Sequence, residues 1–359
     1  MVMNILGSIF VFIISGYIAF TNALATQIEN ILPTSEKAGE EEILTDEMSL
    51  LPSIFGNRIP DILLSNAAYQ QAALSNAGTS GQTASTPEEA LVNVFCTFTT
   101  DDLVRTTTGS GFFIDPDGII MTNAHVAQFL LLEETEEFGE TDCIIRTGNP
   151  ASPRYRAELL YLPPAWIEEN ADNLSQTIPL GTGERDYALL YVSESLDGES
   201  TPIVFPALMV ADELLPVSVR GAEVVAAGYP ASELIRNGSN TPLNAQVADT
   251  TISELYTFGS NYADVIAVRG SVVGAEGASG GPVLNDVGEV IGIIVTRGDD
   301  ETDGEGSLRA ITMAHISRTM EQETGQSLPN SLGGNLELKS QIFTDTVAPF
   351  LLQILEDNN

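Results

Sequence analysis

Short apolar segments, each about as long as a β-strand, follow one another along most of the chain. They are rich in β-branched and aromatic residues, and Gly, Pro and Asp stand between them. The segments are LVNVFCTF, GSGFFI, GIIMTNAHV, CIIRTG, YRAELLYL, YALLYV, AEVVAAGYP, ADVIAVRG and EVIGIIVT. Regularly spaced short strands with turns between them are typical of a β-barrel or a β-sandwich. The hydrophobic pattern therefore predicts an all-β fold.

The pattern changes on both sides of this β-rich region. We expect a hydrophobic segment at 1–25, an acidic and polar stalk at 26–87, the β-rich domain at 88–322 and a short tail at 323–359. Within the stalk, IPDILLSNAAYQQAALSN has an apolar stripe and predicts a short helix docked on the folded body. AHISRTMEQETG, which follows Met313, has helical spacing and is expected to close the domain. The acidic stretch 131–142 is expected to be a solvated loop.

The first 25 residues carry no charged side chain, and an apolar core runs from Ile5 to Phe20. The following Ala23-Leu24-Ala25 fits the small-residue pattern that signal peptidases cut. The run is nevertheless long for a signal peptide and barely long enough to span a bilayer. A signal peptide cleaved after Ala25 and a single-span membrane anchor both stay open. Either one predicts an extracytoplasmic protein, secreted or held at the membrane.

The charge balance is strongly acidic, with 50 acidic and 14 basic residues and a formal net charge of −36. Such a chain repels phosphate backbones, so nucleic acid is excluded as a partner. The two Cys and two His residues are scattered and form no zinc pattern. The acidic loop 298–306 does not match the EF-hand pattern of a calcium site, because Ala310 occupies the twelfth position, where an EF-hand has Glu. We therefore expect neither a metal nor a cofactor.

Ser279 lies among glycines and other small residues in GAEGASGGPVLN. On its own this stretch is compatible with a plain turn. His125 at the end of GIIMTNA and Asp186 just before YALLYV are also ordinary when taken singly. Together the three supply a nucleophile, a base that takes its proton and a carboxylate that orients the base. Gly277 and Ser279 can then offer backbone N–H groups to the oxyanion of a tetrahedral intermediate.

Several motifs occur in an order that resembles trypsin-like serine proteases, especially the HtrA/Deg branch. They are TGSGFFIDPDGIIMTNAHV, RDYALLYV, GAEVVAAGYPA and GASGGPVLNDVGEVIGI, and the resemblance covers about residues 88–320. It implies two packed six-stranded antiparallel β-barrels, with His125 and Asp186 in the first barrel and Ser279 in the second. Two features differ from that branch: Ala278 replaces the usual Asn, and the tail leaves no room for a PDZ domain.

The resemblance also implies a substrate pocket beside the nucleophile. Its walls are expected from residues just before Ser279 and from a later strand, namely Val273, Gly274, Ile294, Val295, Thr296 and Arg297. Val273 stands at the position of the pocket base, where no carboxylate is present to receive Lys or Arg. Small or medium aliphatic side chains are therefore expected at the substrate position before the cut.

Cys96 and Cys143 fall in the segments expected to be the first and fourth strands. In the barrel that the resemblance implies, these strands are neighbours, and export supplies an oxidising setting for a disulfide. Two buried free thiols are the alternative.

These features predict an exported or membrane-tethered serine endopeptidase that cuts protein or peptide substrates. A catalytically silent protease fold, serving as a binding or scaffold protein at the cell surface, is the alternative. The net charge of −36 alone would also fit an acidic adhesion protein.

Overall fold

The computed structural model describes residues 62–73, 81, 83–99, 104–135, 139–171, 183–198, 202, 204–238, 241–259 and 262–358. The chain divides into two units, Met1–Gly56 and Asn57–Asn359, and all described residues belong to the second. The expected signal or anchor at 1–25 and most of the expected stalk lie outside the described residues. Within the described ranges, no helix has the length and apolar character needed to span a bilayer.

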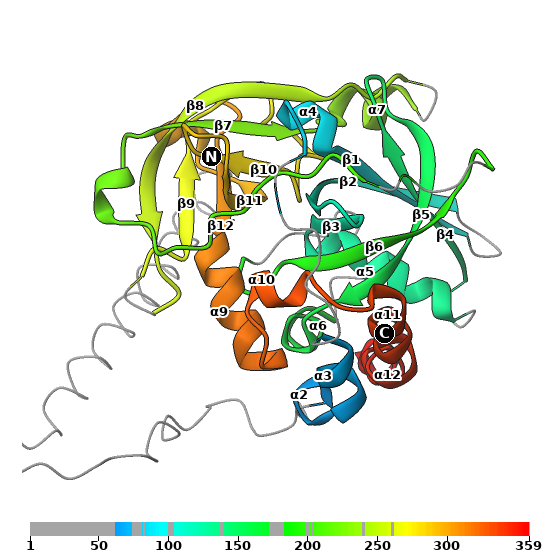
Figure 1. The fold of residues 1–359 in the computed structure, drawn as a ribbon. Coiled ribbons are helices and arrows are strands. Elements are labelled where there is room, and N and C mark those ends of the chain that lie inside the picture. Colours follow the sequence, from blue (N-terminus) through cyan, green and yellow to red (C-terminus); the bar gives the residue numbers. More distant parts are fainter. Residues whose placement is uncertain are drawn as a thin grey trace, which may run out of the picture. The chain divides into compact units, whose positions relative to one another are not determined.

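Six antiparallel strands close into a first barrel in the order β1-β2-β3-β6-β5-β4 (Figure 1). The strands are β1 (Leu91–Thr99), β2 (Val104–Asp115), β3 (Ile119–Thr122), β4 (Glu140–Thr147), β5 (Ser152–Tyr161) and β6 (Ala188–Ser195). Each contains or overlaps an apolar segment that the sequence marks as a strand. Their side chains explain the closure, because an apolar face on each strand is removed from water when the sheet curls on itself.

A second barrel has the order β10-β11-β12-β9-β8-β7. Its strands are β7 (Glu223–Gly228), β8 (Gln246–Tyr256), β9 (Val265–Val268), β10 (Pro282–Leu284), β11 (Val290–Arg297) and β12 (Leu308–Thr312). The predicted fold of two six-stranded antiparallel barrels is confirmed. The apolar pattern had not marked β8, β10 or β12 as strands.

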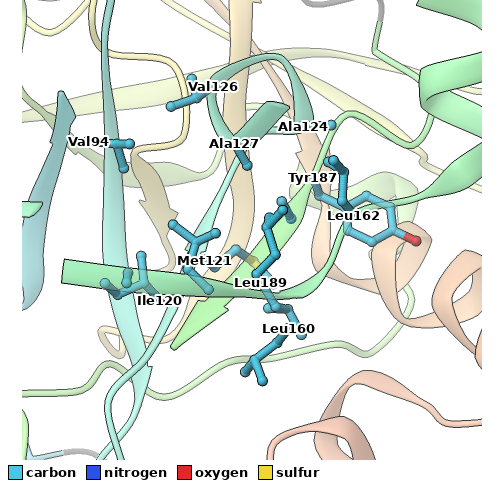
Figure 2. Packing of buried hydrophobic residues seen from close by; sticks show 14 of the residues in the cluster. Val94, Ile120, Met121, Ala124, Val126, Ala127, Leu160, Leu162, Tyr187 and Leu189 are labelled. Atoms are coloured by element: carbon cyan, nitrogen blue, oxygen red, sulfur yellow. The ribbon is translucent and has the colours of Figure 1, made fainter. Parts of the chain in front are cut away.

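The larger buried core fills the first barrel and continues into the second, where it includes Leu284, Val290 and Ile293. In the first barrel this core joins residues from β1, β3, β5 and β6 to the helix that carries His125, as Figure 2 shows for Val94, Met121, Leu160 and Leu189. A second cluster, smaller and wholly aliphatic, lies within the second barrel, from Val224 on β7 to Leu308 on β12. Side chains therefore fill both barrels.

Helices cover the ends of the barrels. The described ones are α2 (Ile62–Ser65), α3 (Ala67–Ala73), α4 (Pro87–Ala90), α5 (Ala124–Leu131), η1 (Leu132–Glu134), α6 (Pro164–Asn170), η3 (Val217–Val219), α7 (Ser232–Asn237), α8 (Asp300–Asp303), α9 (Met313–Thr324), α10 (Leu328–Ser331), α11 (Leu336–Thr346) and α12 (Ala348–Asn358). The helix expected after Met313 is α9. The expected tail folds into α10, α11 and α12, which the apolar pattern did not reveal.

The segment 62–73 lies on the domain as α2 and α3 rather than apart from it. Gln70 on α3 donates hydrogen bonds from its side-chain nitrogen to the carbonyls of Leu63 and Thr324, at 3.1 and 2.9 Å. Tyr69 on the same helix is buried, 2% exposed. This part of the stalk region thus docks against the end of α9, as its apolar stripe suggested.

The acidic stretch 131–142 differs in part from the expected solvated loop. Leu131 and Leu132 are buried, and the stretch continues through η1 into β4. Residues 136–138 lie outside the described ranges. The two leucines complete the apolar face of α5, which explains why the first part of the stretch is folded against the barrel.

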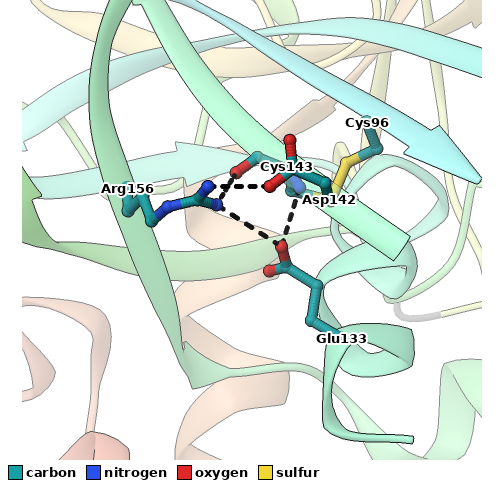
Figure 3. Close-up of a disulfide and its surroundings, with 5 residues drawn as sticks. All are labelled: Cys96, Glu133, Asp142, Cys143 and Arg156. Carbon is teal, nitrogen blue, oxygen red and sulfur yellow. Dashed lines mark hydrogen bonds and ion pairs between the residues drawn. A yellow bond between two sulfur atoms is a disulfide. The ribbon is translucent and has the colours of Figure 1, made fainter. Parts of the chain in front are cut away.

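Cys96 and Cys143 form a disulfide between β1 and β4 (Figure 3). The two residues are direct cross-strand partners, with their Cα atoms 4.0 Å apart. Glu133 accepts a 2.7 Å hydrogen bond from the Cys143 N–H, and Arg156 donates to the Cys143 carbonyl at 3.2 Å. The disulfide therefore cross-links β1 and β4 at a point where hydrogen bonds with Glu133 and Arg156 also fix the backbone of Cys143.

Candidate active site

His125 belongs to the first turn of α5. The sequence suggests a strand that ends in a polar turn, whereas in the structure β3 ends at Thr122 and α5 begins at Ala124. Asn123 stands at the junction with extended backbone, and its side-chain amide donates a 2.7 Å hydrogen bond to the Asp186 carbonyl. The start of the helix therefore fixes His125 and holds it beside the loop before β6.

Asp186 makes two hydrogen bonds to His125, one with each carboxylate oxygen. Its Oδ2 lies 2.8 Å from His125 Nδ1, and its Oδ1 accepts the His125 backbone N–H at 2.9 Å. Asp186 is fully buried, and His125 is 7% exposed. A carboxylate only accepts, so the proton of the neutral imidazole belongs on Nδ1 and Nε2 carries the free lone pair. This is the tautomer that a general base needs.

Ser279 lies in the loop before β10 and is partly exposed. Its carbonyl accepts a 2.7 Å hydrogen bond from the Ser110 N–H in β2 of the first barrel. The next residue, Gly280, is so close to that strand that a Cβ would fall 2.0 Å from the Ser110 carbonyl oxygen and 2.6 Å from Thr122 Oγ1. Thr122 ends the strand that leads to His125. The structure therefore brings the serine loop against the strands that carry the histidine.

The Ser279 hydroxyl donates to the Val295 carbonyl on β11, at 3.2 Å. In this conformation the hydroxyl proton is directed at the second barrel. Transfer of that proton to an imidazole requires the hydroxyl to turn about its Cα–Cβ bond. Such rotations between staggered positions are available to a partly exposed serine.

The backbone around Gly277 has the orientation of an oxyanion site. The Glu276 carbonyl accepts a 2.6 Å hydrogen bond from the Ala231 N–H. Because a trans peptide is planar, the N–H of Gly277 points to the opposite side. Among the described residues, neither this N–H nor that of Ser279 donates to a protein acceptor. Gly277 has a φ of 92°, and a Cβ there would lie 2.7 Å from the Tyr229 carbonyl oxygen, so glycine is required.

A buried serine that the sequence analysis did not single out holds this loop. The Ser110 hydroxyl donates to the Gly277 carbonyl at 2.7 Å and accepts from the Tyr229 N–H at 2.8 Å. Ser110 is fully buried. The only sequence signal for it is its place between two glycines in GSGFFI, where a small residue lets two strands approach.

The expected pocket residues are not gathered around one open pocket. Val273 is fully buried in the aliphatic core of the second barrel. Gly274 lies against the 298–306 loop, and a Cβ there would fall 1.8 Å from the Gly306 carbonyl oxygen. Ile294 is also buried, whereas Arg297 is exposed and forms a 2.6 Å ion pair with Asp300.

Two expected pocket residues, Val295 and Thr296, do line a cavity of about 340 Å³. The cavity is otherwise lined by Gly183, Tyr256, Phe258, Val265, Arg309, Ala310 and Ile311. Val295 also accepts the hydrogen bond of the Ser279 hydroxyl. The cavity is therefore mainly apolar, has Arg309 as its one cationic lining residue, and shares Val295 with the Ser279 hydrogen bond. In the described part of the chain, no group of three or more His, Cys, Asp or Glu side chains is arranged to hold a metal ion.

A family model described as the trypsin-like peptidase domain matches residues 109–293. No curated protein matches the chain. Among solved structures, the active form of the Rv3671c protease from M. tuberculosis is 20% identical, with 71% of this chain and 93% of that chain covered and a TM-score of 0.41. The inactive form of the Rv3671c protease is 21% identical, with 66% and 89% covered and a TM-score of 0.38.

Proposed function

Because the chain belongs to the family of trypsin-like peptidases, we propose that it is a serine endopeptidase that uses Ser279, His125 and Asp186 as a catalytic triad. The observation that carries this proposal is the pair of hydrogen bonds from His125 to Asp186, which leaves Nε2 free as a base. The free N–H groups of Gly277 and Ser279 support it independently.

In the proposed mechanism, Ser279 Oγ attacks the carbonyl carbon of the scissile peptide bond while His125 Nε2 takes the hydroxyl proton. The buried Asp186 carboxylate stabilises the imidazolium that forms. The Gly277 and Ser279 N–H groups donate to the oxyanion of the tetrahedral intermediate. His125 then gives its proton to the leaving amine, and an acyl-enzyme remains on Ser279. Water, activated by His125, attacks the acyl carbon and releases the second product.

Substrates are proposed to be proteins or peptides with a small or medium aliphatic side chain before the cut. The cavity lined by Val295 and Thr296 is mainly apolar, and its one charged lining residue is the cationic Arg309, so it disfavours a Lys or Arg side chain. The acidic surface, at a net charge of −36, disfavours acidic peptides.

The site of action is proposed to be outside the cytoplasm. Support comes from the uncharged apolar segment at 1–25, as a signal peptide or an anchor, and from the Cys96–Cys143 disulfide, which persists in oxidising compartments. Within the family, the quoted motifs favour an HtrA/Deg-like enzyme.

The direct test is labelling with a fluorophosphonate, which reacts with an activated serine. We expect the wild-type chain to be labelled and the Ser279→Ala variant to remain unlabelled. Digestion of a peptide library, followed by sequencing of the cuts, then reads the preference before the cut. A dominant preference for Arg or Lys would contradict the proposed aliphatic specificity.

A catalytically silent binding or scaffold protein is the second candidate. One observation favours it, namely that the Ser279 hydroxyl donates to Val295. A wild-type chain that folds but takes up no fluorophosphonate would establish this candidate over the peptidase.

A further inference from the structure

The two residues that flank Asp186 are both held by helix α9. On one side, Arg185 Nε donates to Glu323 Oε1 at 2.7 Å. On the other side, the Tyr187 hydroxyl lies 2.8 Å from Thr319 Oγ1. Positions 319 and 323 are four residues apart on α9, so both side chains lie on one helix face. One face of this helix therefore contacts the residues on both sides of Asp186, through Glu323 and Thr319.

The backbone conformation of Arg185 requires stabilisation by its surroundings. Its φ is 57°, in the left-handed region that side chains with a Cβ rarely occupy, and it is the one non-glycine residue of this kind among the described residues. A residue in this conformation persists only where its surroundings fix it. The ion pair with Glu323 is the contact that fixes the Arg185 side chain from another element, because its second partner, Glu184, is its own neighbour in the chain.

Glu323 is built into the protein rather than lying on its surface. Its side chain is 16% exposed, and its second oxygen accepts a 2.6 Å hydrogen bond from the Tyr161 hydroxyl on β5. Burial raises the pKa of Glu323, and the hydrogen bond from Tyr161 and the charge and hydrogen bond of Arg185 oppose that rise. The carboxylate therefore has a partner on each oxygen, and both partners come from the first barrel.

The contact between Tyr187 and Thr319 joins two hydroxyls, and either can be the donor. The Thr319 hydroxyl also lies 3.0 Å from the His315 carbonyl and 3.2 Å from the Ile316 carbonyl within α9. Tyr187 is fully buried, and its other side-chain partner, Tyr161, belongs to the first barrel, so Thr319 is the partner that ties its hydroxyl to α9.

We propose that Glu323 and Thr319 are positioning residues for the proposed peptidase reaction. They hold Arg185 and Tyr187, and through them the Asp186 carboxylate, in register with His125. Neither touches His125, Ser279 or a substrate. This inference rests on the proposed function, since it concerns the same triad.

The first test compares the rate of fluorophosphonate labelling in three variants. Glu323→Gln removes the carboxylate charge, and Thr319→Val removes, with little change of shape, the hydroxyl that Tyr187 contacts. Both should slow labelling by about tenfold or more, because small misplacements of a catalytic group reduce rates steeply. Glu321→Gln is the matched control, since it removes the same charge from an exposed position on the same helix, and it should label as the wild type does. The dependence on probe concentration should assign the loss to the bond-forming step rather than to probe binding.

The second test is a rescue. Glycine adopts a left-handed φ without strain, so it needs no ion pair to remain there. Glu323→Gln combined with Arg185→Gly should therefore recover most of the labelling rate that Glu323→Gln alone loses. A purely structural role predicts the opposite, because a glycine adds flexibility to an already weakened protein. Thermal unfolding followed by circular dichroism monitors folding in each variant.

Normal labelling of both Glu323→Gln and Thr319→Val would overturn the inference, as would a double variant slower than Glu323→Gln. If Glu323→Gln is unfolded at the assay temperature, recovery of folded, reactive protein in the double variant still supports it, and failure to recover overturns it. Absence of labelling in the wild-type chain would instead refute the proposed function. The two failures are therefore distinguishable.

Discussion

The Ser110 hydroxyl of the first barrel donates a 2.7 Å hydrogen bond to the Gly277 carbonyl of the second. The two residues are separated by 167 positions in the chain, yet they meet where the barrels join. The same hydroxyl accepts from Tyr229, and the Ser110 N–H donates to the Ser279 carbonyl. Three contacts of one buried residue therefore set the backbone around the proposed nucleophile.

Ser110→Ala is expected to lower both the stability of the fold and the activity. The loss of activity should be larger than the loss of stability alone would cause. The change leaves the Gly277 carbonyl and the Tyr229 N–H without their partner, which costs about 1–3 kcal/mol for each buried group. The N–H groups that face the oxyanion are then free to shift, and removal of one such donor costs about 10²–10³ in kcat. Fluorophosphonate labelling rates and thermal unfolding measure the two effects. Ser253→Ala is the control, because within the described residues that hydroxyl has no hydrogen-bond partner.

Asp186→Asn should keep the fold but lower kcat by about 10⁴, as in the worked serine-protease triad. An amide at this position can donate to Nδ1, which places the imidazole proton on Nε2, where it cannot act as a base. His125→Ala should remove base catalysis altogether. Hydrolysis of a peptide identified from the library gives these rates. Near-normal turnover by Asp186→Asn would exclude the proposed role of the carboxylate.

Asp115 in β2 should make the protein more stable at mildly acidic than at neutral pH. Burial raises the pKa of Asp115 to about 6, its hydrogen bond from the Asp117 N–H opposes the rise, and the Asp117 charge adds to it. The folded pKa therefore exceeds the unfolded value, so the folded state binds the proton more tightly. The resulting penalty is full above about pH 6 and disappears as the pH falls below about 4.

Asp115→Asn is accordingly expected to raise the unfolding temperature at pH 7, by removing at most about 3 kcal/mol of penalty. Asparagine keeps an oxygen that accepts the Asp117 N–H, so the turn is retained. Denaturation series at pH 4 and pH 7 measure the effect, which should shrink at the lower pH. An equal gain at both pH values would mean that the charge of Asp115 is not its source. Asp117→Asn, at an exposed position, should change the stability less.

The Cys96–Cys143 disulfide should contribute to stability of the first barrel. A separation of 47 residues corresponds to about 4 kcal/mol in the chain-entropy account. The double variant Cys96→Ser/Cys143→Ser is expected to unfold at correspondingly lower denaturant concentration. Mass spectrometry of the wild-type protein, alkylated without prior reduction, should find no alkyl groups. Two alkyl groups on the native chain would show that the bond does not form.

The β-rich character of the domain could be predicted because each short apolar segment is a local signal. The two barrels and the roles of His125 and Asp186 were predicted from the resemblance of whole motifs to a known family, since these two residues are 61 positions apart in the chain. Strands β8, β10 and β12 were missed for physical reasons. β10 has only three residues, and most positions of β8 are partly exposed, so its sequence shows no continuous apolar face.

Other features depend on contacts between distant segments and leave no local pattern. Val273 is part of a core cluster because β7, β9 and β12 close around it, which no spacing in the sequence reveals. Ser110 and Glu323 each have hydrogen-bond partners more than a hundred positions away in the chain, so their structural roles leave no local pattern. The helices of the tail were not predicted, because α11 and α12 pack on β5, α3 and α6, and such contacts between distant segments leave no local pattern.

Helix α9 lies on the C-terminal side of His125, Asp186 and Ser279. A chain made from its N-terminus therefore contains all three side chains before the helix exists, and domains fold as their sequence becomes complete. Until α9 forms, Arg185 and Tyr187 lack Glu323 and Thr319 as partners. On the proposed role of Glu323 and Thr319, the Asp186 segment therefore reaches its final position only after α9, near the end of the protease domain, has been made and has folded.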